Sequence, residues 1–173
     1  MNKIIKINLG AGKKYLDGYI NCDVVTEIKA DKYFNLDKPP YPFKDDSADE
    51  VLMDNALEHV QEIAPVFGEV YRILKNNGIL RIYVPYIKSD GAFQDPTHKH
   101  FFTEHTMDYF TKEFDYNYYT KIRFSKVKAE LFCDNKTPLS KIRYLIPFKN
   151  ILKHFLFNIY DGIYFELRAI KEK

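Results

Sequence analysis

Two glycines and one acid, each at the end of a short apolar segment, are the residues best placed to do chemistry in this chain. Residues 4–9 are mostly apolar and run into Gly10 and Gly12, and residues 19–22 run into Asp23. Such segments indicate strands of a buried parallel sheet, and glycines at a strand tip let a ligand approach bare backbone. In open α/β sheets the ligand crevice lies at the carboxyl ends of the strands, where a carboxylate can accept hydrogen bonds from both ribose hydroxyls. The pair predicts a nucleoside-containing ligand, although Gly-x-Gly also occurs where it only closes a tight turn.

The elements that follow would position this pair within a sheet. Residues 50–53 and 79–85 are apolar segments typical of buried strands. Between them, residues 60–74 carry apolar side chains at three- and four-residue spacing, as in an amphipathic helix. Asn77 or Gly78 is expected to end that helix in the left-handed conformation. The order strand, helix, strand predicts a parallel sheet with crossover connections.

The second half of the chain departs from this alternation. Residues 86–100 are expected to form a loop, and residues 121–133 alternate polar and apolar side chains as in a strand. Residues 138–160 are expected to form an amphipathic helix interrupted at Pro147, and residues 163–170 a final strand. We therefore expect a single domain spanning the whole chain, in which the middle of the second half elaborates the substrate side. The expected limits are 1–173 for the domain and 85–160 for this loop and helical elaboration.

Composition and charge limit the class of protein. The chain has 173 residues, an apolar fraction of 46%, a charged fraction of 29% and a net charge of +2, which is ordinary for a globular domain. Two isolated cysteines and the lack of a signal peptide or a membrane-length apolar segment favour a cytoplasmic location. Acids dominate residues 17–62 and bases dominate residues 121–153. An acidic substrate or a lipid surface could use that field, although a solvated face is the simpler interpretation.

Three further segments, in order and spacing, carry a resemblance to a known family. They are residues 7–12, residues 41–51 together with 56–60, and residues 69–80. On these segments the chain resembles class I S-adenosylmethionine-dependent methyltransferases with a type 11 methyltransferase domain. The resemblance implies a Rossmann-like α/β fold with a mostly parallel central sheet, an antiparallel last strand and helices on both faces. Residues 95–103 also resemble a loop of short family members found among sugar- and glycan-modifying genes.

The resemblance implies S-adenosyl-L-methionine as cofactor and a set of residues that hold it. The glycine turn would face the methionine part, the acid would hold the ribose hydroxyls, two residues would sit at the adenine, and three would line the strand end beneath the sulfonium. In that order they are Gly10, Ala11 and Gly12; Asp23; Asn35 and Leu36; Asp54, Asn55 and Ala56. The chain departs from the family twice. Only ten residues separate Gly12 from Asp23, so the usual helix must be shortened or lost, and Asn35 stands where an aspartate is common.

Methyl transfer from a sulfonium is an in-line displacement that depends on positioning within a dry pocket. A hydroxyl or nitrogen acceptor additionally needs a base within hydrogen-bond reach. The catalytic candidates are His98, His100 and Asp95, on the loop that should project over the methyl group; His59 and His105 are weaker candidates. No helical His-x-x-x-His pair accompanies them, so no metal site is expected.

The resulting hypothesis is methyl transfer to a small molecule or glycan, on oxygen. The alternative is a non-catalytic module with the methyltransferase fold that binds a partner. A nicotinamide-dependent dehydrogenase is excluded because Tyr15 stands where the third glycine of its motif belongs. Nucleic-acid methylation is disfavoured because residues 54–57 do not form a Pro-Pro-Tyr type motif. For the basic segment 141–154, a cap over the substrate pocket, a homodimer contact and a peripheral membrane contact stay open.

Overall fold

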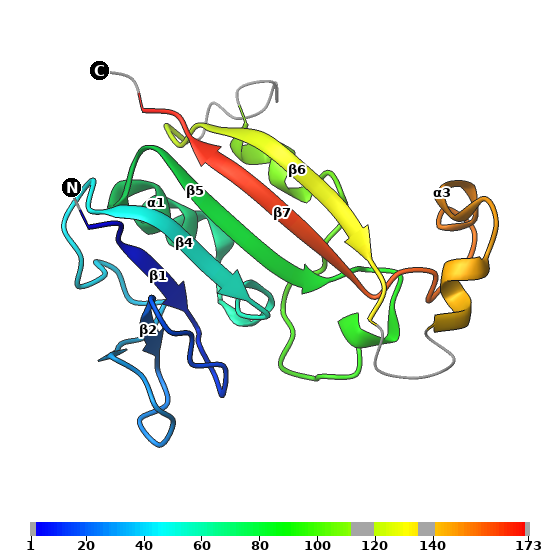
Figure 1. Ribbon diagram of the computed structural model, residues 1–173, viewed down its shortest axis with the longest axis horizontal. Helices are drawn as coiled ribbons and strands as arrows, with labels where there is room; N and C mark the ends of the chain where they lie inside the picture. Colours follow the sequence, from blue (N-terminus) through cyan, green and yellow to red (C-terminus); the bar gives the residue numbers. More distant parts are fainter. Residues whose placement is uncertain (1–2, 112–119, 135–140, 172–173) are drawn as a thin grey trace.

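The computed structural model describes residues 3–111, 120–134 and 141–171, and it contains one seven-stranded sheet (Figure 1). The strands are β1 (Lys6–Leu9), β2 (Ile20–Asp23), β3 (Lys32–Tyr33), β4 (Ala48–Asp54), β5 (Leu74–Pro85), β6 (Phe124–Phe132) and β7 (Gly162–Ala169). The helical elements are η1 (Leu57–His59), α1 (Ile63–Ile73), η2 (Asp90–Ala92), η3 (Thr106–Phe110), η5 (Arg143–Leu145) and α3 (Lys149–Leu152).

The strand order is β3-β2-β1-β4-β5-β7-β6. Neighbours from β3 to β5 are parallel, whereas β7 lies antiparallel to both β5 and β6. The chain leaves β1 toward β2 on one side and later returns to β4 on the other, so the topological switch point lies between β1 and β4. The predicted α/β class, the Rossmann-like parallel sheet and the antiparallel last strand are confirmed.

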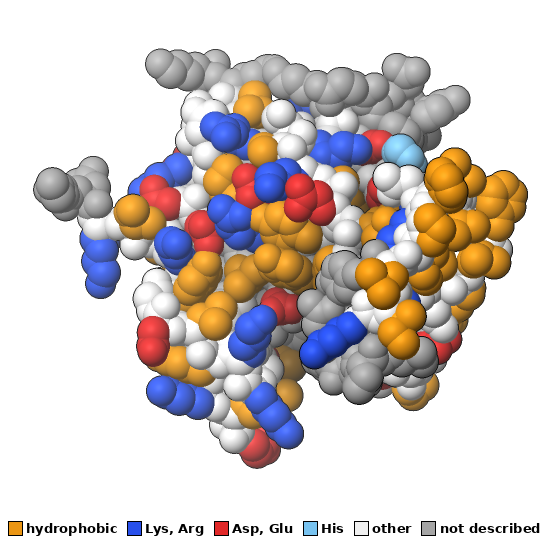
Figure 2. Space-filling view, turned by 45° about the vertical axis from the view of Figure 1, so that its right-hand side comes forward, with side chains coloured by type: hydrophobic (Ala, Val, Ile, Leu, Met, Phe, Trp, Pro, Cys, Tyr) orange, Lys and Arg blue, Asp and Glu red, His pale blue; other side chains and the backbone are white. Residues whose placement is uncertain are grey.

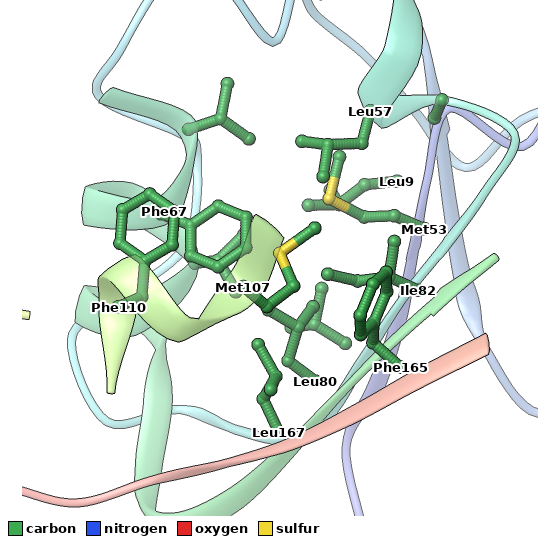
Figure 3. Packing of buried hydrophobic residues seen from close by; sticks show 14 of the residues in the cluster. Leu9, Met53, Leu57, Phe67, Leu80, Ile82, Met107, Phe110, Phe165 and Leu167 are labelled. Atoms are coloured by element: carbon green, nitrogen blue, oxygen red, sulfur yellow. The ribbon is translucent and has the colours of Figure 1, made fainter. Parts of the chain in front are cut away.

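One face of the sheet is apolar and is covered by α1 and η3. The sheet supplies buried side chains such as Leu80, Ile82 and Leu167, and α1 supplies Phe67. The ring of Phe67 stacks on Phe110 of η3, with ring centroids 4.0 Å apart, so the two helices share one core layer (Figure 3). This packing fixes the distance between the helices and the sheet and holds the carboxyl ends of the strands in place.

The opposite face of the sheet is polar and aromatic, and none of the described helices lies over it (Figure 1). Arg81 of β5 contacts Glu166 and Tyr164 of β7, and Tyr83 lies against Tyr164 with ring centroids 4.7 Å apart. The expectation of helices on both faces therefore does not hold for the described residues. The physical reason is connection length, because a crossover helix needs about a dozen residues or more and β1–β2 are joined by residues 10–19 alone.

The helix expected to be shortened or lost between Gly12 and Asp23 is indeed absent from those described residues. A side-chain network joins β1 to β2 instead. The Asn8 amide donates to Asn21 Oδ1 at 3.0 Å, and the backbone N–H of Leu16 donates to the same oxygen at 3.0 Å. The Asn21 amide in turn donates to the Leu16 carbonyl at 3.0 Å. Asn21 thereby stabilises the connection between β1 and β2, which contains no helix.

The helix α1 ends earlier than the sequence predicts. Leu74, the residue after it, already pairs with Ala48 of β4, so strand pairing replaces the expected cap. Asn77 has a φ of +66°, as expected, but it lies inside β5. A Cβ at Gly78 would lie 3.0 Å from the Lys75 carbonyl oxygen, which explains the glycine by close backbone approach.

The long helix expected over residues 138–160 is wrong for the described part, residues 141–160. Residues 141–142 are helical and are followed by two short elements, η5 and α3, while residues 138–140 lie outside the described chain. Pro147 has no N–H to continue a helix, and Phe148 and Asn158 have φ values of +54° and +57°, which lie outside helical geometry. No helix in the described residues combines the length and apolar character needed to cross a membrane.

Candidate functional site

A cleft of about 290 Å³ opens at the carboxyl ends of β1, β2 and β4, next to the topological switch point. Its lining contains seven of the nine residues expected at the cofactor: Gly10, Gly12, Asp23, Asn35, Leu36, Asn55 and Ala56. The sheet therefore brings together residues that are up to 46 positions apart, from Gly10 to Ala56. The other two expected residues, Ala11 and Asp54, do not line this cleft.

The two glycines of the turn serve different purposes. Gly10 has a φ of +69°, and a Cβ placed on it would lie 2.5 Å from the Cβ of Ala56, so this glycine is required by the close approach of two strand ends. Gly12 has a φ of +54°, and a Cβ there would meet nothing within 4 Å. Gly12 also lines the cleft, so a side chain added at this position would take up room beside a bound ligand.

The Asp23 carboxylate is held in a fixed orientation at the edge of the cleft. One oxygen accepts the Gly12 backbone N–H at 2.7 Å, and the other accepts the Val25 backbone N–H at 2.9 Å. Each carboxylate oxygen has a second lone pair, which leaves acceptor capacity for hydroxyl donors. The carboxylate therefore fits a ligand that presents two neighbouring hydroxyls, as the sequence predicts.

Three other expected cofactor residues differ in what they offer. Asn35 uses its side-chain oxygen to accept the Asp37 N–H at 2.8 Å. That oxygen is thus tied to its own turn, and Asn35 lines the cleft. Ala11 is buried and offers backbone only, its N–H bonding to Cys22 at 2.9 Å. Asp54 forms an ion pair with Lys14 and lines a neighbouring groove.

This groove, of about 930 Å³, runs from the strand ends over the open polar face of the sheet. Its walls include Tyr83 of β5, Asp95 and His98 of the loop after β5, and Phe132 at the end of β6. Asn55 and His59 line both the cleft and the groove. A ligand in the cleft and a second molecule in the groove would therefore meet at these two residues.

Glu58 lines the groove next to His59, and the sequence analysis missed it as a candidate functional residue. Glu58 is only 1% exposed, and neither of its carboxylate oxygens has a hydrogen-bond partner on another residue of the described chain. Burial, with smaller contributions from the nearby acids Asp54 and Asp95, raises the pKa of this carboxyl to about 7. A carboxyl with this pKa exchanges protons near neutral pH, which is the property of a general acid or base.

Glu58, His59 and His98 form a cluster in which one donor atom of each lies within 4.8 Å of the others. Burial lowers the pKa of His59, and the neighbouring His98 adds to that effect. Two imidazoles and a carboxylate are a donor set that zinc and other transition metals use. The expectation that no metal is held stays a prediction, which metal analysis of the purified protein can check.

Hydrogen bonds assign the proton positions in this cluster. The His98 Nδ1 lies 3.0 Å from the Ala92 carbonyl oxygen, which can only accept, so Nδ1 carries the proton. The Thr97 hydroxyl donates to Asp95 at 2.7 Å, so its contact with His59 Nδ1 at 2.9 Å requires that nitrogen to donate as well. In the neutral form of both histidines, Nε2 is therefore the nitrogen that keeps the lone pair a proton acceptor needs.

The remaining catalytic candidates have structural partners. His100 Nε2 donates to the Val60 carbonyl oxygen at 2.9 Å, which ties the loop to the end of η1. Asp95 accepts the N–H and the hydroxyl of Thr97 at 2.8 and 2.7 Å, and one of its oxygens lies 4.0 Å from His98 Nε2. The structure thus brings Asp95 and His98 into the groove and leaves His100 outside it. His105 is exposed beside Asp108 and lines neither cavity.

Comparison with known proteins agrees with this arrangement. Residues 23–82 match a family model described as a methyltransferase domain. No curated protein sequence matches the chain. A SAM dependent methyltransferase from Archaeoglobus fulgidus is similar in structure, with 17% identity, a TM-score of 0.69, and coverage of 95% of this chain and 86% of that chain.

Two further solved structures show the same likeness. An S-adenosylmethionine dependent methyltransferase from Mesorhizobium loti has 13% identity and a TM-score of 0.63, covering 97% of this chain and 93% of that chain. A protein from Methanosarcina mazei described in the same terms has 14% identity and a TM-score of 0.61, covering 99% and 95%. At these identities the likeness establishes a shared fold.

Proposed function

We propose that this chain, which has the fold and a matched segment of the class I S-adenosylmethionine-dependent methyltransferases, transfers a methyl group to a hydroxyl of a small-molecule or glycan acceptor. The cofactor implied by that class, S-adenosyl-L-methionine, would occupy the cleft, and the acceptor would occupy the groove. The observation that supports this division is the pair of residues, Asn55 and His59, that line both cavities.

The cleft residues fit the cofactor by chemistry and by space. Asp23 would hold the ribose hydroxyls with the lone pairs that the backbone N–H groups leave unused. Gly12 would face the methionine part, where the missing side chain leaves room. Asn35 and Leu36 would border the adenine, and Asn55 would mark the point nearest the groove. When bound, the sulfonium supplies an electrophilic methyl group.

The acceptor side needs a group that takes the hydroxyl proton. We assign this role to His98, because its Nε2 has a free lone pair and its side chain lines the groove. Glu58 would stabilise the imidazolium that forms, since its carboxylate lies in the same cluster and is buried away from water. Asp95 would orient the loop, and His100 would position it through Val60.

The cofactor is tested by calorimetric titration of the protein with S-adenosylmethionine and S-adenosylhomocysteine. We expect micromolar binding by the wild type and a loss of about tenfold to a hundredfold in Asp23→Ala, because hydrogen bonds to a charged group contribute about 1.5–3 kcal/mol. Asp17→Ala is the matched control, since Asp17 is exposed and lines neither cavity. If the folded wild type binds neither ligand, the chain is a non-catalytic binding module instead.

Transfer itself is tested by following labelled methyl groups from the cofactor to a panel of acceptors, sugars first. His98→Gln should lower kcat about 100-fold or more, in the range of a lost general base, and leave cofactor affinity unchanged. His100→Gln should affect KM and kcat through loop position by less than that. Treatment with a chelator should leave the rate unchanged, and a rate that fell and then recovered with added zinc would assign the cluster to a metal.

A further inference from the structure

The described residues between β6 and β7 present an unusually apolar surface to solvent. Leu145, Phe148 and Phe155 are 81%, 76% and 79% exposed, although side chains of this size are normally buried. Figure 2 shows the hydrophobic side chains gathered on the side of the molecule that carries this segment. We call it the apolar surface and define it by its exposed members: Phe93, Phe101, Ile142, Leu145, Phe148, Ile151, Phe155, Leu156 and Phe157.

The apolar surface is continuous across two parts of the chain. Phe93 and Phe101, from the loop after β5, stack with ring centroids 4.9 Å apart. Phe93 also lies 6.2 Å from Phe157, centroid to centroid, and so joins that loop to the segment before β7. Monomeric proteins rarely expose contiguous apolar patches that join separate elements unless the patch binds something.

Polar bonds hold the segment so that its apolar side chains face outward. Arg143 forms a two-pronged ion pair with Asp161, at 2.7 and 2.6 Å. Lys153 contacts both oxygens of Glu104 at 2.9 and 2.7 Å. Asn158 accepts a hydrogen bond from the Asp90 backbone at 2.7 Å. Arg143, Lys153 and Asn158 are thus held against the rest of the domain, while the large apolar side chains of the same segment are exposed.

Charge decides between the two simplest occupants, a lipid bilayer and a second copy of the chain. Residues 141–160 contain three lysines and one arginine but neither aspartate nor glutamate. Arg143 and Lys153 already pair with Asp161 and Glu104, whereas Lys141 is exposed. A two-fold interface would bring Lys141 of both copies to one face, where the segment has no acid. An anionic bilayer accepts the apolar side chains in its acyl region and an exposed lysine such as Lys141 at its head groups.

We propose that the apolar surface seats this protein on an anionic lipid bilayer as a peripheral, non-spanning contact. Apolar side chains from α3, η5 and the loop after β5 enter the interface, and Lys141 lies at the level of the head groups. The groove reaches the same region, because Phe132 and Gly162, at the two strand ends that flank the segment, line it. Resting on the proposed function, this position would offer the groove to an acceptor carried on a lipid.

Vesicle co-sedimentation of the whole protein tests the proposal without cofactor or acceptor, so that its failure is separate from a failure of methyl transfer. Vesicles of phosphatidylcholine alone are compared with vesicles that also contain phosphatidylglycerol. The triple variant Leu145→Ser, Phe148→Ser and Phe155→Ser should bind about tenfold or more weakly, since each side chain would otherwise bury its apolar area. Ile4→Ser with Val127→Ser removes exposed apolar side chains elsewhere and should bind as the wild type does.

The charge contribution is tested with Lys141→Glu. This variant should lose about thirtyfold in binding to the anionic vesicles, because a base near the membrane surface contributes about 1 kcal/mol and the charge reversal doubles that contribution. Wild-type protein that stays in the supernatant with both vesicle types overturns the proposal. A triple variant that binds unchanged, or a wild-type dimer that the triple variant dissociates, overturns it equally and assigns the surface to another role.

Discussion

Gly10 and Gly12 have similar backbone angles but different surroundings, and we predict that alanine will affect them differently. Both have positive φ values, +69° and +54°, where an L-residue costs about 1–2 kcal/mol. Only at Gly10 would the new Cβ collide, because Ala56 Cβ is 2.5 Å away and carbon contacts are normally about 3.5–4.0 Å. Overpacking of this kind adds about 1–3 kcal/mol. We expect Gly12→Ala to cost about 1–2 kcal/mol and Gly10→Ala about 2–5 kcal/mol.

A double-mutant cycle isolates the collision. In Gly10→Ala with Ala56→Gly, the nearest remaining atom to the new Cβ is the Ala56 Cα at 3.7 Å, which is an ordinary contact. The double variant should therefore be more stable than the sum of the single changes predicts, by about 1–3 kcal/mol. Urea unfolding followed by far-ultraviolet circular dichroism gives each free energy. A coupling below about 0.5 kcal/mol would refute the close approach of these strand ends.

The same variants separate stability from ligand binding. Gly12→Ala should remain folded yet bind S-adenosylmethionine weakly, because Gly12 lines the cleft and the added Cβ would take up room beside the ligand. Calorimetry at a temperature where the variant is folded measures this directly. Wild-type affinity in Gly12→Ala would mean that the cofactor does not approach the glycine turn.

Three further predictions concern groups away from the turn. Burial raises the Glu58 pKa from 4.5 to about 7, so the folded state binds the proton more tightly than the unfolded state, and the contribution of Glu58 to stability decreases as the pH rises from about 4.5 to 7. Glu58→Gln should reduce this pH-dependent loss of stability by up to about 3 kcal/mol. A pH profile of urea unfolding that is unchanged in the variant would contradict the assignment. Arg72→Leu should lower the free energy of unfolding by about 1–2 kcal/mol, because the guanidinium donates hydrogen bonds to Glu69 and to the Tyr41 and Phe43 carbonyls. Lys75 is half-exposed and forms an ion pair with Asp49, so Lys75→Leu should lower it by under about 1 kcal/mol in the same assay. Equal losses for the two variants would refute this ranking. Phe67→Ala should lower the free energy of chemical unfolding by about 3–5 kcal/mol, since the ring is fully buried and stacks on Phe110 of η3. A loss under about 2 kcal/mol would mean that α1 and η3 do not share a core.

Local patterns were sufficient for the strand ends and the cleft. Gly10, Gly12 and Asp23 were recognisable because each follows an apolar segment, and a parallel sheet places the carboxyl ends of its strands at one edge. The lost helix before Asp23 followed from connection length alone. The resemblance to methyltransferases, which rested on residues 7–80, is confirmed by the matched segment and the shared fold.

Contacts between distant residues could not be derived from such patterns. Glu58 and His98 meet across forty positions, and nothing periodic joins a helix start to a loop. A weak signal existed, because Glu58 is an acid between two apolar residues, Leu57 and Val60, that are themselves buried. The helix prediction for residues 141–160 failed for another reason. The apolar spacing there is helical, but Pro147 and the left-handed conformation of Phe148 interrupt the helix.

The place of β7 in the sheet has a consequence for how the chain is made. Because β7 lies between β5 and β6, neither of those strands has its full set of partners until residues 162–169 leave the ribosome. Until then β6 lacks its only neighbour among the described strands and β5 shows one bare edge, and bare strand edges are templates for pairing with other chains. A break or stall before Gly162 should therefore yield aggregates, because β7 is the strand whose pairing completes the described sheet.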